Sequence, residues 1–488
     1  MKLFHLLFVQ LVFFFALQSC NHANKEKSEI NVQSDKKGDS SRIVADSFTV
    51  IIGTYLGNKT RNYYGANAPE KLNVIWKHYL GSGRSEGKHG EDKQWFGSGW
   101  TGQVLITEEY GKLCLYIGAL DHHLKKLNAE FGEMIWQFKF DDGIKGTGSV
   151  YVNTKTKKAE EKYSIIQGSK RGYGLSLNAP ECYSLRSVSM LNGKELWRYN
   201  VRKTSSVSRD VDGTAIIVND TIIAPLENGY LGFLDANITN SIGKFNTPLE
   251  IDLVPLFTGK DHRRNLIAEG SPTVLGYNVY NTCGSGWLFG VDVSSKEHVF
   301  KYYVGADLNG TSPVTSDSCL LVTVEREYIP GSGGIYKIDP RKESEDCVLW
   351  FFPTGSKSYA DWNGGIIGSA SVKDNLCVFT GIDGYLYLVD HIKIEPNSSS
   401  SSPDLKYQHP KPVLLDRKYI GPTISTPIVV EDKVIACGYS GIYLYWVNSE
   451  DKLELLDKLN TGVESTPVVW DHRIYVGSRD GYLYCLGE

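Results

Sequence analysis

The 488-residue chain carries a formal net charge of −4, which argues against non-specific binding to nucleic acid. Its 49 glycines and 29 tyrosines beside only 3 methionines favour short strands and turns, and no long amphipathic helix is evident. Four of the nine cysteines lie inside predicted strands, where buried thiols are expected rather than disulfides. They are Cys114, Cys377, Cys437 and Cys485.

The N-terminus carries a targeting signal. Lys2 and His5 precede an apolar run over residues 6–17, which is short for a membrane span and predicts a signal peptide. Ser19 followed by Cys20 resembles the bacterial lipoprotein signal, which implies lipid transfer to the Cys20 thiol and cleavage before it. An ordinary secretory signal with an incidental cysteine is the alternative. Residues 21–46 are polar and charged, so we expect a disordered tether there and a single folded domain over 47–488.

The first part of that domain contains two strand-like runs. Phe48 to Ile52 is β-like and is followed by a polar loop. Residues 81–95 form a Gly-rich, charged stretch that predicts a loop. Between them, residues 73–80 match the last strand of a unit that recurs later in the chain, with Trp76 in its aromatic position.

The recurring unit opens on small residues, continues through two strands, turns at a Gly-containing pair and returns through an aromatic strand. The final unit shows the turn most plainly at Asp480-Gly481, where Gly supplies the positive φ of a type I′ turn. The openings are Gly97-Ser-Gly, Gly146-Thr-Gly, Gly213-Thr-Ala, Gly270-Ser-Pro, Thr311-Ser-Pro, Gly368-Ser-Ala, Ser425-Thr-Pro and Ser465-Thr-Pro.

Most units continue into a fourth strand with an aromatic residue, as at Trp136, Trp197 and Trp350. Three units have degraded versions of it, around residues 244–245, 413–415 and 453–456. A period of roughly 40 residues with four strands per unit predicts an all-β fold, the β-propeller.

The two ends of the chain complement each other. Residues 73–80 have no first three strands before them, and the last unit has three strands and no fourth. We therefore predict that the ends complete one blade, which closes the ring and removes exposed sheet edges. The chain then has eight first strands and eight fourth strands, which predicts eight blades. Seven blades is the alternative. Longer segments at 154–162, 169–182, 249–268 and 325–334 are expected as inserted loops, and the serine-rich 396–412 as a flexible one.

Several of these motifs resemble one family. Ser-Pro-Val, Val-Tyr-Val-Gly-Ser and Asp-Gly-Tyr-Leu-Tyr, followed by a Trp-bearing strand, are similar to the pyrroloquinoline-quinone-type (PQQ-type) propeller repeat. That repeat builds eight-bladed quinoprotein dehydrogenases and the lipoprotein subunit of the outer-membrane β-barrel assembly machine. The resemblance covers residues 72–488 and implies the fold more strongly than the function, because function depends on sites that are grafted onto folds.

The enzymes of this family share features that the chain lacks. They resemble one another in an adjacent Cys-Cys disulfide over the cofactor, and no two cysteines are adjacent here. They also require a carboxylate-liganded Ca²⁺ and a catalytic Asp, whose motifs we do not find. Residues 209–213 supply two acids of a Ca²⁺ loop but no third. We therefore expect neither catalysis nor a bound cofactor or metal, with PQQ or Ca²⁺ binding as the alternative.

Charged residues and tryptophans gather at one mouth of the predicted channel, because the starts of first strands and the turns between second and third strands share one face of a blade. We expect the acids of blades three to five to converge there beside several cations, as a site for a ligand or partner. The alternative is solvated turns whose Asp side chains bond to their own loops. The candidate residues are Trp100, Lys170, Arg171, Arg209, Asp210, Asp212, Glu227, Glu269, Asp307, Glu325, Arg326 and Trp362.

Together these features predict a non-catalytic, lipid-anchored propeller of the bacterial cell envelope. We expect a monomeric binding or assembly scaffold for an envelope protein or a small polar ligand, attached to the membrane through lipid alone. The outer membrane is the expected location, on its periplasmic or its exterior side. The competing hypothesis is a PQQ-dependent oxidoreductase, or another propeller that binds a ligand or Ca²⁺ at the charged mouth.

Overall fold

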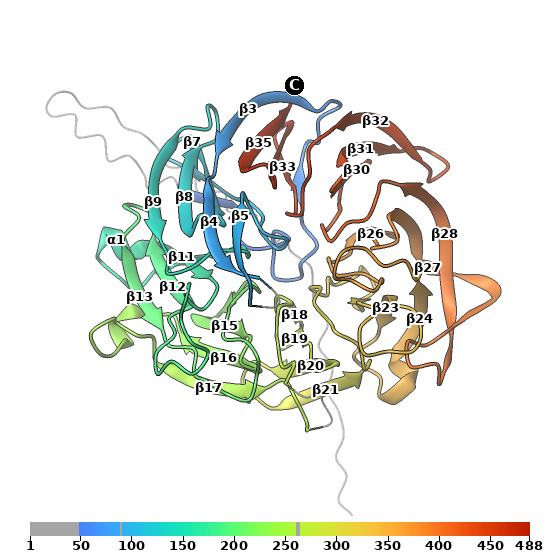
Figure 1. Ribbon diagram of the computed structural model, residues 1–488, viewed down its shortest axis with the longest axis horizontal. Coiled ribbons are helices and arrows are strands. Elements are labelled where there is room, and N and C mark those ends of the chain that lie inside the picture. The colour runs from blue at the N-terminus through green and yellow to red at the C-terminus, as the bar shows by residue number, and fades with distance from the viewer. Residues whose placement is uncertain (1–47, 88–89, 260–263) are drawn as a thin grey trace, which may run out of the picture. The chain divides into compact units, whose positions relative to one another are not determined.

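Short strands joined by tight turns make up the chain, as the repeats predict. The computed structural model describes residues 48–87, 90–259 and 264–488; the signal peptide, Cys20 and the predicted tether lie outside them. Within the folded unit, Asp46–Glu488, eight sheets stand around a central axis in sequence order (Figure 1). The predicted eight-bladed β-propeller is therefore confirmed. No helix in the described ranges is long and apolar enough to cross a membrane.

Each blade is a mainly antiparallel sheet whose first strand faces the axis. Blade one comprises β1 (Phe48–Ile52), β6 (Leu105–Glu109), β7 (Lys112–Gly118), β8 (His123–Asn128) and β9 (Met134–Lys139), and blade two comprises β10 (Ser149–Val152), β11 (Tyr163–Gly168), β12 (Leu185–Ser189) and β13 (Glu195–Tyr199). Blade three comprises β14 (Ile216–Val218), β15 (Thr221–Leu226), β16 (Tyr230–Asp235) and β17 (Glu250–Pro255). Blade four comprises β18 (Thr273–Leu275), β19 (Asn278–Thr282), β20 (Trp287–Asp292) and β21 (His298–Tyr303).

Blade five has three strands in the described chain, and blade eight joins both ends of the domain. Blade five comprises β22 (Leu320–Val324), β23 (Gly334–Ile338) and β24 (Val348–Pro353), and blade six comprises β25 (Ser371–Lys373), β26 (Leu376–Thr380), β27 (Tyr385–Ser401) and β28 (Gln408–Tyr419). Blade seven comprises β29 (Ile428–Val430), β30 (Lys433–Gly438), β31 (Gly441–Val447) and β32 (Leu453–Leu459). Blade eight comprises β2 (Gly65–Ala66), β33 (Val468–Trp470), β34 (Arg473–Gly477), β35 (Tyr482–Gly487) and β3 (Asn73–Tyr79). The remaining elements are β4 (Ser82–Glu86), β5 (Asp92–Phe96), α1 (Ala159–Lys162), η1 (Ile238–Asn240) and η2 (Ser344–Cys347).

The Asp-Gly-Tyr-Leu-Tyr motif is a closed hydrogen-bond network. Gly481 has φ 97°, and Asp480 Oδ1 accepts the Tyr482 N–H at 3.1 Å while Oδ2 accepts the Tyr484 hydroxyl at 2.6 Å. Asp480 itself does not take positive φ, so the predicted type I′ turn is wrong although the hairpin is present. Instead the Gly481 N–H bonds to the Ser478 carbonyl, and Gly alone adopts the left-handed conformation at the end of the turn.

The small residues that open each unit form a belt between neighbouring blades. Backbone N–H groups donate to the hydroxyl of the next blade, in the pairs Gln103–Thr147, Thr214–Ser271, Ser271–Thr311, Thr311–Ser369 and Ser369–Thr426, at 2.7–2.9 Å. The preceding Gly is required because a Cβ on Gly213 or Gly310 would lie 2.7–2.8 Å from a carbonyl oxygen of the next blade. The belt corrects two predicted openings: blade five begins at Gly310, one residue earlier, and blade one begins at Gly102 rather than at residues 97–99.

The ends of the chain close the ring as predicted. β3 pairs antiparallel with β35, and Trp76 lies opposite Cys485. The indole N–H of Trp76 donates to the Ala129 carbonyl of blade one at 3.1 Å. Trp136 and Trp350 make the same kind of bond to the blade that follows theirs, to the carbonyls of Met190 and His391. The tryptophan of the fourth strand therefore ties one blade to the next.

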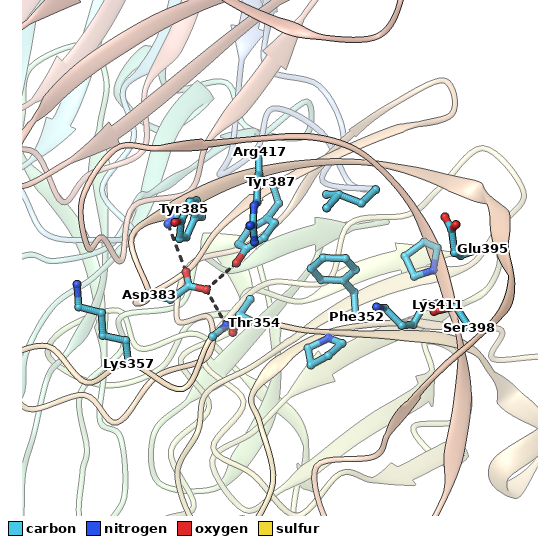
Figure 2. A pocket seen from close by; sticks show the side chains of 14 residues that line it. Phe352, Thr354, Lys357, Asp383, Tyr385, Tyr387, Glu395, Ser398, Lys411 and Arg417 are labelled. Carbon is cyan, nitrogen blue, oxygen red and sulfur yellow. Dashed lines mark hydrogen bonds between the residues drawn. The ribbon is translucent and has the colours of Figure 1, made fainter.

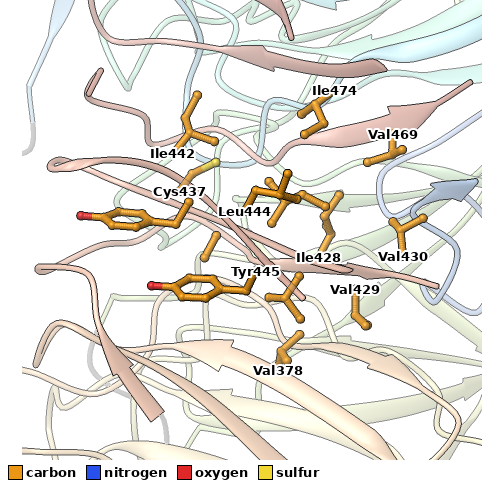
Figure 3. Packing of buried hydrophobic residues seen from close by; sticks show 14 of the residues in the cluster. Val378, Ile428, Val429, Val430, Cys437, Ile442, Leu444, Tyr445, Val469 and Ile474 are labelled. Atoms are coloured by element: carbon orange, nitrogen blue, oxygen red, sulfur yellow. The ribbon is translucent and has the colours of Figure 1, made fainter. Parts of the chain in front are cut away.

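Apolar side chains fill the space between adjacent blades (Figure 3). One cluster joins Val378 of blade six, Ile428 and Leu444 of blade seven, and Val469 and Ile474 of blade eight. The four cysteines predicted in strands, at positions 114, 377, 437 and 485, are buried free thiols, as expected.

The polar loop after β1 fills one end of the channel, a role that the sequence did not predict. We call residues 53–66 the plug, and they bond to first-strand regions all around the ring. Their contacts are to Val150 of blade two, Thr214 of blade three, Val274 of blade four, Val314 of blade five, Val372 of blade six, Thr426 of blade seven, Val469 of blade eight and Gln103 at the start of blade one.

Three further predictions are corrected. The fourth strand of blade three is β17, at residues 250–255 rather than around 244–245. Residues 396–412 belong to a long hairpin formed by β27 and β28 rather than to a flexible loop. Residues 81–95 include the hairpin of β4 and β5. In each case polar residues hid strands that pair antiparallel, with bulges in the β16–β17 and β27–β28 pairs. The fourth strands near 413–415 and 453–456 are present as predicted.

Candidate binding site at the channel mouth

The residue before each small opening residue lies at the end of the channel away from the plug. This ring of positions is polar or charged on blades one to five and on blade eight, and apolar on blades six and seven. Its members are Thr101, Lys145, Asp212, Glu269, Asn309, Ile367, Ile424 and Glu464. The belt sets their register, so neighbouring blades bring them side by side.

Lys145 lies among four carboxylates from blades three and four. Its ammonium forms an ion pair with Asp212 and lies 4.0 Å from Glu269. Glu227 accepts the Asp212 N–H at 3.2 Å and the Ser208 hydroxyl at 2.5 Å. The Arg171 N–H donates to Asp210 at 3.0 Å. We call Lys145, Asp210, Asp212, Glu227 and Glu269 the acidic cluster.

Burial and mutual repulsion perturb the ionisation of the acidic cluster. Burial raises the pKa of Glu269 to about 7, although Lys145 opposes the shift. Burial and the charge of Asp212 raise the pKa of Glu227 well above its ordinary value and also raise the pKa of Asp210. For Lys145, burial alone would lower the pKa, but the surrounding carboxylates outweigh it and raise the pKa. One ammonium does not balance four carboxylates, so the cluster tends to hold a proton or attract a cation.

Three of these acids are the residues of the cluster that could hold a metal ion. Carboxylate oxygens of Asp210, Asp212 and Glu227 lie within 4.8 Å of one another, and all three side chains are buried. Asp212 already directs one oxygen to Lys145, and its Oδ1 has no hydrogen-bond partner in the described chain. Oxygen ligands of this kind suit Ca²⁺ or Mg²⁺.

A second acidic group lies in blade five. Asp307 accepts a hydrogen bond from Asn265 at 2.9 Å, and Glu325 accepts one from Asn309 at 2.7 Å. The charge of Asp307 contributes to the raised pKa of Glu269. The acids of blades three to five therefore lie in adjoining parts of the mouth.

Lys170 and Arg171 meet the β4–β5 hairpin. Lys170 donates to the Glu86 carbonyl, and Arg171 forms an ion pair with the Glu86 carboxylate. Since the Arg171 backbone also holds Asp210, these residues connect the hairpin to the acidic cluster.

The apolar part of the mouth is covered by two tryptophans. Trp100 packs with Ile367, Ile382 and Ile424 of blades six and seven, and Trp362 lies against the same cluster. The next residue, Thr101, donates to the Asp212 carbonyl of blade three at 3.3 Å. The chain at 100–101 therefore crosses the axis between opposite sides of the ring.

Two candidate residues do not join the others. The guanidinium of Arg209 donates to the Val201 carbonyl of its own connection at 2.8 Å and to the Ala179 carbonyl of the inserted segment of blade two at 2.6 Å. Arg326 donates to the Gly331 carbonyl of its own turn at 3.1 Å. Arg326 therefore stabilises its own turn, as the alternative drawn from the sequence expects, whereas Arg209 is buried rather than solvated and joins two neighbouring loops.

Sequence reasoning missed Lys145 and Glu86. Lys145 stands directly before Gly146, just as Asp212 and Glu269 stand before their glycines, so the repeat register was the signal that could have found it. Glu86 lies in a hairpin that the sequence predicted as a loop, and no pattern pointed to its contact with Arg171.

Comparison with known proteins supports the fold. No protein-family model and no curated protein matches the chain. Among solved structures, BamB from Moraxella catarrhalis is 12% identical with a TM-score of 0.52, covering 86% of this chain and 100% of that chain. The quinohemoprotein alcohol dehydrogenase from Comamonas testosteroni is 11% identical with a TM-score of 0.56, covering 89% and 80%. The computationally designed Ika8 protein is 10% identical with a TM-score of 0.51, covering 86% and 100%.

The chain shares their propeller fold. Because the identities are this low, the likeness extends to architecture and not to activity. BamB and a quinohemoprotein enzyme are similar to this propeller to almost the same degree, so the fold alone does not distinguish between them.

A PQQ group does not fit the residues at the axis of this propeller. A flat cofactor on the axis needs open space there, whereas Trp100 fills the apolar side of the mouth and is only 8% exposed. Lys145 occupies the space between the carboxylates on the other side. The adjacent cysteine pair that would cover such a cofactor is also missing from the sequence.

Proposed function

We propose that this protein is a non-catalytic, lipid-anchored propeller of the bacterial cell envelope that binds other proteins or a small polar ligand at its charged mouth. Its fold is shared with the BamB scaffold, and its N-terminal sequence resembles a lipoprotein signal. Attachment to the outer membrane through lipid on Cys20 belongs to the same proposal.

The observation that carries this proposal is that the chain occupies its own axis. The plug bonds around the whole ring at one end, and residues 100–101 cross the other. Lys145 and Glu269 still keep 26% and 19% of their side chains exposed, so a partner reaches the acidic cluster from the mouth. Such a surface suits recognition by charge complementarity.

The second candidate function is a PQQ-dependent oxidoreductase or another propeller that binds a ligand or Ca²⁺. The similarity to quinohemoprotein alcohol dehydrogenases and the carboxylates of Asp210, Asp212 and Glu227 favour it. The poor fit of the axis to a quinone weighs against the enzyme.

Recovery of partners from envelope membranes tests the proposal. The tethered full chain should recover a specific protein partner, and Arg171→Ala or Asp307→Ala should weaken that recovery while leaving the melting curve nearly unchanged. Lys301→Ala, an exposed residue on β21, serves as the control. Quinone absorbance or stoichiometric Ca²⁺ in the dialysed protein would instead support the second function, and equal recovery by all variants would place binding away from the mouth.

Anchoring needs its own test. Cys20→Ser should move the protein to the soluble fraction, because acyl chains are its expected membrane affinity. A Cys20→Ser variant that stays with membranes after a salt wash would show that the lipoprotein interpretation is wrong.

A further inference from the structure

The long hairpin of blade six is built onto blade five. Its strands β27 and β28 contain 17 and 12 residues, while the other strands of these two blades have three to six. The Trp350 indole of blade five donates to the His391 carbonyl at 3.0 Å, and Ser400 donates to the Phe351 carbonyl at 2.7 Å. The ring of the buried His409 lies 5.7 Å from that of Tyr336, edge to face. These contacts fix the hairpin in place.

A cavity of about 820 Å³ lies beneath this hairpin, between blades five and six (Figure 2). Its floor is aromatic, formed by Phe352, Tyr385 and Tyr387, and three cations, Lys357, Lys411 and Arg417, stand around it. We call this cavity the rim pocket. Its volume lies within the range of pockets that hold ligands in proteins.

The three cations of the rim pocket lie near aromatic rings and do not form ion pairs with carboxylates of the described residues. Lys357, Lys411 and Arg417 lie 5.8, 5.9 and 4.9 Å from the ring centroids of Tyr419, Phe352 and Tyr385. None of them forms a salt bridge within the described residues. A cation over a ring at a solvent-open site is held weakly, so each cation remains available to an incoming anion.

The two acids that line the rim pocket offset only part of the charge of its three cations. The Asp383 carboxylate is hydrogen-bonded within the wall of the pocket, where it accepts bonds from the Tyr387 hydroxyl and the Gly355 N–H, both at 2.6 Å. Glu395 stands on the hairpin at the side of Lys411 (Figure 2). The pocket therefore presents a cationic and aromatic surface, opposite in sign to the acidic cluster at the mouth.

We propose that the rim pocket binds an acidic segment of a partner protein. Lys357 and Lys411 stand on opposite sides of the pocket and Arg417 on a third (Figure 2), an arrangement that suits several carboxylates along an extended chain better than one compact anion. The same hairpin also carries exposed apolar side chains: Ile394, Leu405 and Tyr407 are 42%, 57% and 45% exposed. Exposed apolar groups on an element that also presents a polar site are typical of protein interfaces.

This inference rests on the proposal that the protein works by binding other proteins, and it adds a second surface to the mouth. The probe is a fluorescein-labelled peptide, Gly-Glu-Phe-Glu-Asp-Phe-Glu-Asp-Gly, with a control peptide carrying Gln and Asn for Glu and Asp. Fluorescence anisotropy should show saturable, salt-sensitive binding of the acidic peptide alone. Lys411→Glu and Arg417→Glu should each weaken it by about tenfold or more, because they reverse a charge that contacts the ligand. Lys301→Glu makes the same charge change on β21 and should leave binding unchanged.

Four outcomes would overturn the inference. They are no saturable binding to the wild-type chain, equal binding of both peptides, unchanged binding by Lys411→Glu and Arg417→Glu, or tighter binding of a galacturonic acid oligomer at the same residues. The last outcome would assign the pocket to acidic carbohydrate. Membrane recovery separates this inference from the proposed function: a partner recovered equally by the rim variants defeats the rim pocket alone, whereas no recovered protein at all defeats the protein-binding part of the proposed function.

Discussion

Arg61 illustrates how single residues of the plug hold the ring. Its side chain is fully buried, and its donors reach the carbonyls of Pro272, Tyr55 and Thr214 and the Thr54 hydroxyl. Burial lowers the pKa of Arg61 to about 9. The hydrogen bonds to carbonyl oxygens must therefore offset the loss of hydration, because no carboxylate is among these partners.

Arg61→Ala should destabilise the domain by about 3 kcal/mol, since it leaves several buried carbonyls without donors. Urea unfolding followed by tryptophan fluorescence measures the change. Lys59→Ala provides the matched control, because the Lys59 side chain is exposed and only its carbonyl bonds to Val274. Equal stability of the two variants would show that the plug does not depend on Arg61.

Glu269 should make the stability of the domain depend on pH. Its pKa in the folded protein is about 7, above the ordinary value of 4.5. The folded state thus binds more protons than the unfolded state between these values, and stability falls as pH rises from about 4.5 through 7. Burial of the group is the main cause, and Asp210 and Glu227 shift in the same direction.

Glu269→Gln should remove about 2–3 kcal/mol of this pH-dependent loss, because the amide cannot ionise. Free energies of unfolding at pH 5 and pH 8 measure it. The exposed Glu297→Gln serves as control and should keep the wild-type slope. A Glu269→Gln variant with the same slope as the wild type would place the titration elsewhere in the acidic cluster.

At the scale of elements, β3 contributes to the stability of the domain through its tryptophan, Trp76. Trp76 is half-buried, its indole bonds to the Ala129 carbonyl, and its ring lies against Gly132 and 6.0 Å from the ring of Tyr475. Ala129 also accepts a bond from Arg473, so the carbonyl keeps one donor when the indole is removed. Packing therefore carries most of the contribution of Trp76.

Trp76→Ala should lower stability by about 2 kcal/mol, and Trp76→Phe by less than about 1 kcal/mol, because the ring preserves most of the contact. Val74→Ala on the same strand is the control, since Val74 is 47% exposed. Thermal unfolding of the three variants compares them. If Trp76→Phe were as unstable as Trp76→Ala, the hydrogen bond rather than packing would be the main contribution of Trp76 to stability.

The elements also show what the sequence could and could not predict. Blade closure by residues 73–80 was predictable because the aromatic position of Trp76 repeats at Trp136. The plug was not, because Arg61 bonds mainly to backbone carbonyls, which carry no sequence signal. In the candidate site, Asp212 and Glu269 were predictable from the repeat register. The roles of Arg209 and Arg326 were not, because a long side chain at a turn can reach the carbonyls of its own or a neighbouring loop as easily as the mouth.

At the scale of the whole molecule, the N-terminal stretch acts as both plug and closing strand. The plug contacts the first-strand region of every blade, and β3 covers β35 at the outer edge of blade eight. A ring of blades keeps its shape only while each blade packs on two neighbours. Without this stretch, the channel loses its filling and β35 becomes a bare edge, which is a template for pairing with other chains.

A chain that lacks residues 48–80 should therefore aggregate or melt at least about 10 °C lower, because it loses buried contacts along the whole axis. Size-exclusion chromatography and a melting curve measure both effects. The matched control removes residues 21–46 instead, which are predicted to be a tether and should leave the melting curve of the folded domain unchanged. A monomeric 48–80 deletion with unaltered melting would mean that the other blades close the ring alone, and that the stretch adds only a covering strand.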